Sequence, residues 1–400
     1  MGVDSRPVLI AGAGPVGLVL AWRLARAGLP VRVFEREPQL IPMLRSSTIH
    51  PPTLDMLDED GVSAALHAAG RITPTWQIRL HETGEHAEFD LSIIADATRH
   101  PWRLQCDQSV LSMELEKRLR ALDASIVQRG ANVVAAGEDD EGPWLDWQRG
   151  EEAPVRERGS HIVGCDGGRS LIRDAIGASF DGSIYPETTI LATTTFPFED
   201  HLPELSGINY VWAPDGTYSL LRLPDVWRVS LHPPANEDLE EAMRPERISA
   251  RLAEITPAAE NAPIREIRPY RVHQRIASRW RRGRLLIAGD AAHLNNPKGG
   301  MGMNGGIHDV FELAACLTEI FKGADPSTIA RYEARRHPVV RDDIIGQADQ
   351  NRARMWEPSL EGRRKLLADL QALASDRERC YKYLLKTSMI EGLRRAATLA

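Results

Sequence analysis

The sequence predicts an α/β protein in which a Rossmann-like domain is interleaved with a domain built on a mixed or antiparallel sheet, with helices at the carboxyl end. Two observations carry this prediction. Three glycine-centred motifs begin at Gly12, Asp166 and Gly289, far apart in the chain. Alternating, aromatic-rich segments typical of strands lie between them. A chain of 400 residues, 42% of them hydrophobic, exceeds the usual size of one domain and can fill sizeable cores.

The first motif has the setting of a dinucleotide-binding turn. It reads Gly12-Ala-Gly14-Pro-Val-Gly17, follows a short apolar run and precedes a helical apolar spacing. The first glycine allows a tight turn, the second lets the backbone approach a pyrophosphate, and the third lets helix and strand pack closely. A second apolar strand ends in Glu35, which can accept hydrogen bonds from a ribose diol. The residues predicted to contact the dinucleotide here are Gly12, Gly14, Pro15, Val16, Gly17, Glu35 and Arg36.

The third motif also has the order of strand, turn and helix. An apolar strand precedes Gly289-Asp290, and helical spacing runs from Asn304 to Phe321. Asp290 can accept a hydrogen bond from a ribityl hydroxyl. The glycine-rich residues 299–302 lead into a helix amino end, which favours an anion or an electron-rich carbonyl. Three such patches imply one long ligand lying between distant chain segments, and FAD meets that requirement.

Together the motifs resemble the signatures of the single-component FAD-dependent aromatic hydroxylases, the group A flavoprotein monooxygenases with the para-hydroxybenzoate hydroxylase architecture. The resemblance covers roughly residues 7–345 and includes the stretch Asp166-Gly-Gly-Arg-Ser-Leu-Ile-Arg173. It implies non-covalent FAD, NADH or NADPH as co-substrate, and O2. It further implies that a flavin C4a-hydroperoxide hydroxylates a small phenolic or heteroaromatic ring.

The resemblance also assigns cofactor-contacting residues, position by position. Arg45 is similar to an arginine that lies along the FAD in the family. Gln108 is similar to a residue beside the ribityl chain, with Gln105 as a competing choice. Asp166 and Arg173 match the motif that serves both FAD and NAD(P)H. The set implied for these later segments is Arg45, Gln108, Asp166, Gly167, Arg173, Gly289, Asp290, Pro297, Gly300, Gly302, Met303 and Asn304.

The predicted domains interleave along the chain. The FAD-binding domain is expected over 1–75, 107–180 and 276–345, because all three motifs fall there. Residues 76–106 and 181–275 carry the alternating strand patterns and are expected to form a sheet over the flavin. The acidic stretch at 137–142 is expected to be a solvated turn between hairpin strands, and residues 346–400 a carboxyl-terminal helical segment.

No catalytic residue is assigned from the sequence. The candidates are Tyr210, Tyr218, Arg222 and His232 on the strands above the flavin, and Pro297, which matches the family proline beside the active site. The guanidinium of Arg222 could hold a substrate carboxylate, although aromatic residues on such strands more often serve packing. Lys298 either touches the flavin edge or an anionic substrate, or is a solvated loop lysine.

The segment 377–395 is expected to be an amphipathic, basic helix. We expect it to dock on its own domain and close one side of the substrate cavity, because residues 363–371 offer a partner helix. Contact with a lipid surface is the alternative.

Composition disfavours several other classes of protein. The net charge of −7 is mild and mixed, so no nucleic-acid partner is expected. No apolar run approaches the roughly 20 residues of a membrane span, and the amino-terminal residues lack the pattern of a secretion signal. The four cysteines and 12 histidines lack metal-ligand spacing, so we expect no bound metal and a cytoplasmic location.

Other functions share these motifs and stay open at the level of sequence. One is a same-fold hydroxylase of a hydrophobic quinone or polyketide-type substrate. Another is a non-catalytic FAD-binding regulator. A flavin halogenase is disfavoured, because Trp144-Leu-Asp-Trp147 does not continue into the Trp-x-Trp-x-Ile-Pro motif of those enzymes. The substrate, the choice between NADH and NADPH, ring opening after hydroxylation and the oligomeric state are not encoded in these motifs.

Overall fold

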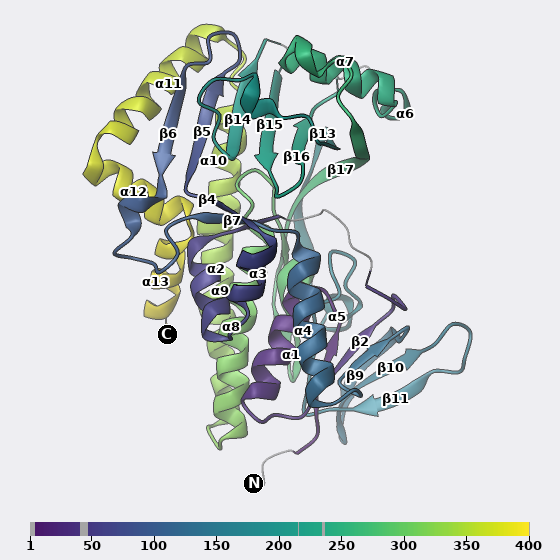
Figure 1. Ribbon diagram of the computed structural model, residues 1–400. Coiled ribbons are helices and arrows are strands. Elements are labelled where there is room, and N and C mark those ends of the chain that lie inside the picture. Colours follow the sequence, from purple (N-terminus) through teal and green to yellow (C-terminus); the bar gives the residue numbers. More distant parts are fainter. Residues whose placement is uncertain (1–4, 41–46, 215, 234–236, 400) are drawn as a thin grey trace.

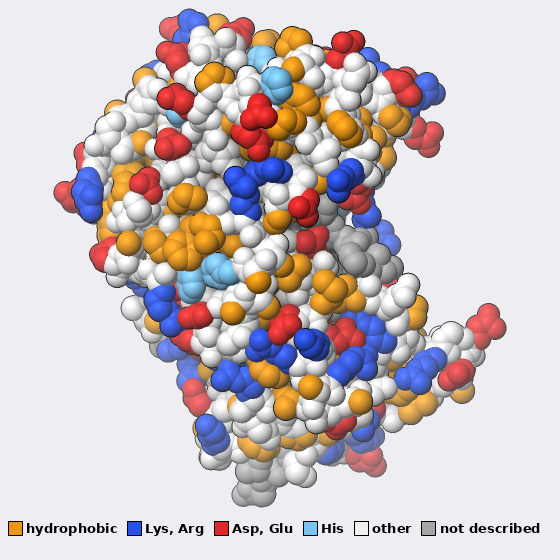
Figure 2. Space-filling model, in the orientation of Figure 1, with side chains coloured by type: hydrophobic (Ala, Val, Ile, Leu, Met, Phe, Trp, Pro, Cys, Tyr) orange, Lys and Arg blue, Asp and Glu red, His pale blue; other side chains and the backbone are white. Residues whose placement is uncertain are grey.

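The computed structural model describes residues 5–40, 47–214, 216–233 and 237–399, which form two lobes (Figure 1). The lower lobe in that view contains the amino terminus, and the carboxyl-terminal helices run along one side of the molecule. Figure 2 shows acidic and basic side chains interspersed over this face. None of the described helices combines the length and apolar content that a membrane span requires.

The lower lobe is built on a sheet with strand order β18-β19-β12-β1-β2-β8. The neighbours β19, β12, β1, β2 and β8 are parallel, and β18 joins antiparallel to β19. The carboxyl ends of β19, β12 and β1 therefore meet at one edge, and one glycine motif follows each of them. The strands are β1 (Val8–Ala11), β2 (Val31–Glu35), β8 (Val127–Arg129), β12 (His161–Gly164), β18 (Arg281–Arg282) and β19 (Leu285–Ile287).

Helices cover this sheet, and α1 (Pro15–Arg26) packs against α4 and α8. Pro15 begins α1 favourably, because its missing N–H would have no partner at that position. Gly28, with φ of +84°, follows directly after the residue that caps the helix. The other helices of this lobe are α2 (Pro51–Glu59), α3 (Ser63–Ala69), α4 (Gln108–Leu122), α5 (Leu171–Ala175), α8 (Gly302–Phe321) and α9 (Ala330–Val339).

The upper lobe is built on a sheet with strand order β20-β17-β13-β16-β15-β14-β5-β6. Its neighbouring strands are antiparallel except for the parallel pair β14 and β5. The strands are β5 (Thr75–Leu80), β6 (His86–Asp90), β13 (Phe180–Thr194), β14 (Ile208–Ala213), β15 (Gly216–Arg222), β16 (Trp227–Leu231), β17 (Ile264–Ala277) and β20 (His293–Leu294).

The two faces of the upper sheet pack into different cores, as the alternation of side chains along its strands requires. One face carries Val211, Tyr218 and Leu220 and is covered by α6 (Leu239–Ala242) and α7 (Pro245–Ile255). The other face carries Trp76 and Trp212 and packs against the carboxyl-terminal helices. Short 3-10 helices are η1 (Leu91–Ile94), η2 (Phe198–Asp200), η3 (Pro257–Ala259), η4 (Gly289–Ala291) and η5 (Pro326–Ile329).

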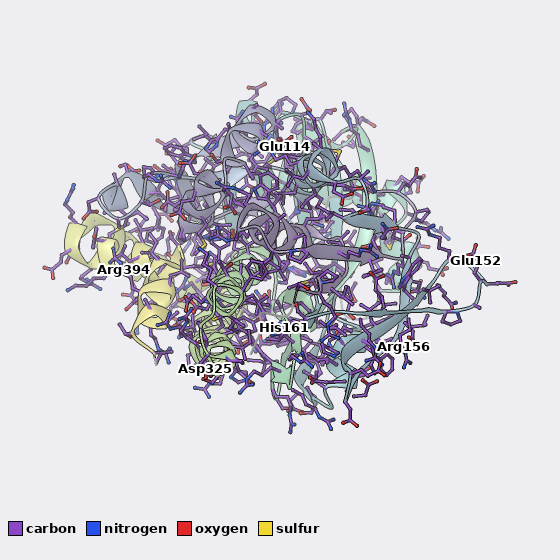
Figure 3. The ribbon with its side chains drawn as sticks, turned by 90° about the horizontal axis from the view of Figure 1, so that it is seen from below. Glu114, Glu152, Arg156, His161, Asp325 and Arg394 are labelled. Carbon is purple, nitrogen blue, oxygen red and sulfur yellow. The ribbon has the colours of Figure 1, made fainter. Side chains whose placement is uncertain are left out.

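Two small sheets complete the architecture. The order β3-β7-β4 joins β3 (Thr48–Ile49), β7 (Arg103–Gln105) and β4 (Arg71–Thr73) near the junction of the lobes. The other consists of β9 (Asn132–Asp139), β10 (Gly142–Gln148) and β11 (Val155–Arg158) and projects from the lower lobe. Figure 3 shows Glu152 near the end of this projection. The turn between β9 and β10 is exposed, as expected, but it is shorter than the acidic stretch 137–142, because 137–139 belong to β9 and Gly142 begins β10.

The carboxyl-terminal segment docks on the upper lobe. The single helix expected over 377–395 is instead two helices, α12 (Arg377–Thr387) and α13 (Ile390–Thr398), because Met389 has a left-handed φ of 68° that no α-helix can contain. Cys380 and Leu384 are fully buried with β5 and β6, so docking is confirmed. The preceding elements are the π-helix η6 (Val340–Ile345), α10 (Gly346–Met355) and α11 (Leu360–Ser375).

Candidate active site

The first glycine motif forms a tight turn, and its three glycines differ in backbone angle and in the space around them. Gly12 has φ of +102°, and a Cβ at Gly17 would lie 2.1 Å from the carbonyl oxygen of Gly12. At Gly14 no atom lies within 4 Å of the Cβ position, so the backbone there is open to a ligand. The Oε2 atom of Glu35 accepts a hydrogen bond from the backbone N of Ala13 at 2.8 Å, which fixes this carboxylate beside the turn.

The second motif fastens the loops at the same sheet edge. The Oδ2 atom of Asp166 accepts hydrogen bonds from the backbone N of Leu171 at 2.8 Å and of Ile172 at 3.3 Å, and so caps α5. Burial raises the pKa of this carboxyl group. The buried guanidinium of Arg173 donates to the carbonyls of Gly168 and Ala291, at 3.0 and 3.2 Å. Arg173 therefore ties the second motif to the third.

The third motif is supported by a buried ionic cluster that the sequence analysis missed. Asp309 on α8 accepts hydrogen bonds from the backbone N of Gly289 at 3.3 Å, from Nε2 of His293 at 2.7 Å and from Nε of Arg336 at 2.9 Å. Burial would raise the pKa of Asp309, but the charges of His293 and Arg336 outweigh it, and the pKa is lowered. Asp290 lies in η4, and its side chain is exposed.

The glycine loop before α8 is held by the small sheet. The side chain of Asn304 donates to the carbonyl oxygens of Gly300 at 2.7 Å and of Thr48 at 2.9 Å. His50 Nε2 lies 2.8 Å from the carbonyl oxygen of Gly299, and burial lowers the pKa of His50 well below its usual value, so the neutral ring donates this bond. These contacts fix one conformation of the loop that links the third motif to α8.

The remaining predicted cofactor residues lie in different settings. Val16 packs against Gly289 and Gly306, Gly302 begins α8, and Met303 is buried. Pro297 is exposed and accepts a hydrogen bond from the backbone N of Gly300. The Arg36 side chain is 73% exposed, and Gly167 lies in a turn with φ of +81°. Gln108 begins α4 and is half-buried, whereas its competing choice Gln105 is fully buried and accepts a hydrogen bond from Thr48. Arg45 lies outside the described residues.

A cavity of about 450 Å³, partly open to solvent, lies between the upper sheet, the glycine loop and the carboxyl-terminal helices. Its wall contains three basic and three aromatic side chains and no carboxylate. Gly299 and Met301 belong to the loop of the third motif, so the cavity adjoins the predicted cofactor site. The lining residues are Trp76, Ile78, Arg103, Tyr210, Lys298, Gly299, Met301, Asn351, Arg354, Met355, Tyr383 and Thr387.

The upper sheet separates the four candidates that the sequence offered on its strands. Tyr210 lines the cavity. Tyr218 belongs to the core on the other face and lies 3.0 Å from Nδ1 of His81, and Arg222 pairs with Glu199 at 3.2 Å. His232 lies near Thr189 outside the cavity wall, and its pKa is lowered to about 3 by burial and then by the charge of Lys298. Of these four candidates, Tyr210 alone lines the cavity.

Lys298 and Tyr383 show how distant segments complete the cavity. Lys298 lines it, with Nζ 3.4 Å from Thr217 Oγ1, so the loop lysine faces the cavity. The hydroxyl of Tyr383 on α12 accepts a hydrogen bond from Arg354 on α10 at 3.1 Å. Four cavity residues are absent from the candidates that the sequence offered: Trp76, Arg103, Arg354 and Tyr383. The expected sheet over the flavin includes Trp76 and Arg103, and the expected docking of the carboxyl-terminal helix points toward Tyr383.

Fold and site together define a class of protein. Three glycine motifs meet at the carboxyl edge of a parallel sheet, as in dinucleotide-binding oxidoreductases, and the loop of the third also borders an aromatic cavity that is partly open to solvent. A family model described as an FAD binding domain matches residues 5–344. The chain therefore belongs to this family, the group A flavoprotein aromatic hydroxylases.

Individual relatives agree with this assignment. Para-nitrophenol 4-monooxygenase from Pseudomonas sp. (strain WBC-3) is 31% identical over 393 residues, 97% of this chain and 96% of that protein. 6-Hydroxy-3-succinoylpyridine 3-monooxygenase HspB from Pseudomonas putida (strain DSM 28022 / S16) is 30% identical over 93% of this chain and 95% of its own length. The crystal structure of p-nitrophenol 4-monooxygenase PnpA from Pseudomonas putida DLL-E4 superposes with a TM-score of 0.90 at 29% identity, covering 97% of this chain and 98% of that one. The protein is an FAD-dependent monooxygenase that uses NAD(P)H as reductant.

Proposed function

We propose that this monooxygenase hydroxylates a small, one-ring phenolic or heteroaromatic substrate in the cavity beneath the upper sheet. The observation that carries the proposal is the cavity itself, which shares Gly299 and Met301 with the loop of the third motif and is lined by aromatic side chains. We propose one ring over a polycyclic polyketide because this chain covers nearly the full length of two relatives that are named for one-ring compounds. The two relatives described above are named for a nitrophenol and a hydroxypyridine derivative.

The residues present at the sheet edge fit FAD. The open space at Gly14 admits a pyrophosphate, and the carboxylate of Glu35 is held where a ribose could use it. Asp290 and the glycine loop up to Asn304 would hold the ribityl chain and the ring system. When bound, FAD would accept electrons from NAD(P)H and use them to activate O2 for oxygen transfer to the substrate ring.

The protein itself has to orient the ring and exclude water from the reaction. Trp76 and Tyr210 present aromatic surfaces to the cavity, and Tyr383 is oriented by its hydrogen bond with Arg354. Because α12 forms one wall, the carboxyl-terminal segment shields the site from solvent.

We also propose the division of labour between chain segments. Residues 1–75, 107–180 and 276–345 would be the FAD domain, 76–106 and 181–275 the substrate domain, and 346–400 the segment that closes the cavity. A cytoplasmic location is proposed because all four cysteines are free thiols.

Oxidation of NADH and NADPH by the FAD-loaded protein, measured with a panel of one-ring phenols and hydroxypyridines, tests this proposal. We expect slow oxidation alone, faster oxidation with suitable substrates, and a product heavier by one oxygen atom. Stimulation by polycyclic quinones only would favour the polyketide-type alternative. FAD binding without stimulation by any aromatic compound would favour a regulator.

A further inference from the structure

We infer that the aromatic substrate binds in this cavity as an anion, and that Arg103 binds its charged oxygen. The inference rests on the proposed function and deepens it, because it names the chemical class of substrate and the residue that selects it. The class is an aromatic oxyanion, either a phenolate or a ring carboxylate.

Arg103 is placed in the cavity wall by a rigid backbone. It begins β7, the central strand of the small sheet, and pairs with Thr73 of β4. The side chain is buried, with 3% of the residue exposed, and its guanidinium carbon lies 5.1 Å from the centre of the Trp76 ring. A side chain held in this way is preorganised for a ligand, because little conformational freedom is left to lose on binding.

Among the residues that the structure describes, no carboxylate acts on Arg103 or lines its cavity. The cavity wall includes Lys298 and Arg354 as further cations and no Asp or Glu. Burial lowers the pKa of Arg103, and the groups that act against this are the phenols of Tyr210 and Tyr383, of which Tyr210 also forms a hydrogen bond with Arg103. His50 also lies within its electrostatic reach and is neutral, since burial and then Arg103 lower its pKa. The Nε atom of Arg103 is buried without a hydrogen-bond partner.

Arg336 offers the contrast within the same molecule. It is equally buried, but its Nε donates to the carboxylate of Asp309 at 2.9 Å. Removing a charge from water without a partner costs several kcal/mol, so buried arginines are normally paired in this way. Arg103 bonds only the neutral phenol of Tyr210 and has no carboxylate partner among the described residues, and it faces a cavity, which indicates that the ligand supplies the negative charge.

The chemistry of the reaction fits such a ligand. A guanidinium binds a carboxylate or phenolate oxygen through charge-assisted hydrogen bonds. A phenolate is also more electron-rich than its phenol, and an electron-rich ring favours transfer of an electrophilic oxygen. The neighbouring Trp76 and Tyr210 can contact the ring face while Arg103 contacts the oxygen.

The test measures dissociation constants with the FAD-loaded protein, from the change in flavin absorbance on ligand binding. The probes are para-nitrophenol, its neutral methyl ether para-nitroanisole, and 4-hydroxybenzoate for the carboxylate source. Arg103→Met removes the charge while keeping a long side chain. Arg103→Lys keeps the charge but loses the paired N–H donors of the guanidinium. Arg99→Met, at a side chain that is 58% exposed, is the matched control.

We expect the wild type to bind para-nitrophenolate much more tightly than the ether. Arg103→Met should weaken phenolate binding about 10- to 150-fold, the range for charge-assisted hydrogen bonds, and leave ether binding within about twofold. Arg103→Lys should retain part of the preference for the anion, and Arg99→Met all of it. Methylation of 4-hydroxybenzoate shows which of its two oxygens is bound. If methylating the carboxylate weakens binding and methylating the phenol does not, the carboxylate is the recognised group.

A measurement on the wild type guards against a variant that fails to fold. Affinity for a phenol should rise as pH passes upward through the pKa of that phenol, and the midpoint should move when a phenol of different acidity is used. A midpoint that stays fixed for different phenols, or equal affinity for phenolate and ether, would overturn the inference. So would equal losses of phenolate and ether binding in Arg103→Met. Anion binding that depends on Arg103 without hydroxylated product would uphold the inference and refute the proposed function.

Discussion

Replacing Asp309 by Asn removes one negative charge from the buried cluster behind the third glycine motif. The carboxylate lies between His293 and Arg336, and all three side chains are almost completely buried. Asn has nearly the same shape, so the change removes charge with little change in packing. Arg336 is then left as a buried cation without its counter-charge, and the backbone N of Gly289 loses a charged acceptor.

The expected loss of stability follows from this burial. Breaking a buried ion pair by removing one partner costs about 3–5 kcal/mol. With an unfolding entropy of about 2.1 cal/mol/K per residue, a chain of 400 residues should lose about 4–6 °C in Tm. FAD affinity should also fall, because Gly289 and Asp290 lose their support from α8.

Thermal unfolding followed by circular dichroism measures the loss, with Asp342→Asn as the control. Asp342 forms exposed ion pairs with Arg341 and Arg395, which contribute at most about 1 kcal/mol. Because the pKa of Asp309 is lowered on folding, its contribution is complete above about pH 4 and is lost as pH falls through the folded value. The gap between wild type and Asp309→Asn should therefore narrow below pH 4. An Asp309→Asn variant as stable as Asp342→Asn at pH 7 would refute this reasoning.

Three further changes separate cofactor binding, folding and closure of the cavity. Gly14→Ala should fold normally but lose FAD, since its Cβ meets only the space assigned to the pyrophosphate, whereas Gly17→Ala should be destabilised because its Cβ would lie 2.1 Å from a backbone oxygen. Gly346→Ala is the control, since its Cβ has no neighbour closer than 3.9 Å, and calorimetry with FAD titration distinguishes the three variants. Asp290→Ala should weaken FAD binding by about 1.5–3 kcal/mol for each charge-assisted hydrogen bond lost, and unchanged affinity by fluorescence titration would remove it from the cofactor site. Deleting residues 376–400 should raise hydrogen peroxide release relative to product or unfold the protein, because Tyr383 and Thr387 form part of the cavity wall; a tightly coupled, fully active truncated enzyme would contradict this.

The glycine motifs could be predicted from sequence because their requirements are local. Gly12 needs a positive φ, and a strand and a helix flank it within a few residues. The pattern of the upper strands predicted alternation, but not which face meets the lower lobe. Tyr210 and Tyr218 therefore looked alike, although the sheet places them on opposite faces.

Residues whose role depends on distant partners gave no local signal. Arg103 lies in a strand of only three residues, and its cavity is completed by segments near 210, 298, 354 and 383. Asp309 lies on an apolar helix, where its pairing with Arg336 depends on how α9 packs against α8. The break at Met389 likewise reflects tertiary packing, since the amphipathic spacing continues through it.

The most direct test of the central claim is the fate of oxygen from labelled O2. FAD-loaded enzyme is given NADH or NADPH and an excess of a stimulating one-ring phenol, and the aromatic product is analysed by mass spectrometry. The account predicts that the product carries one labelled oxygen atom on its ring and that Gly14→Ala forms none. An enzyme that is fully loaded with FAD, but oxidises NAD(P)H equally with and without every phenol tested and forms no labelled product, would contradict it.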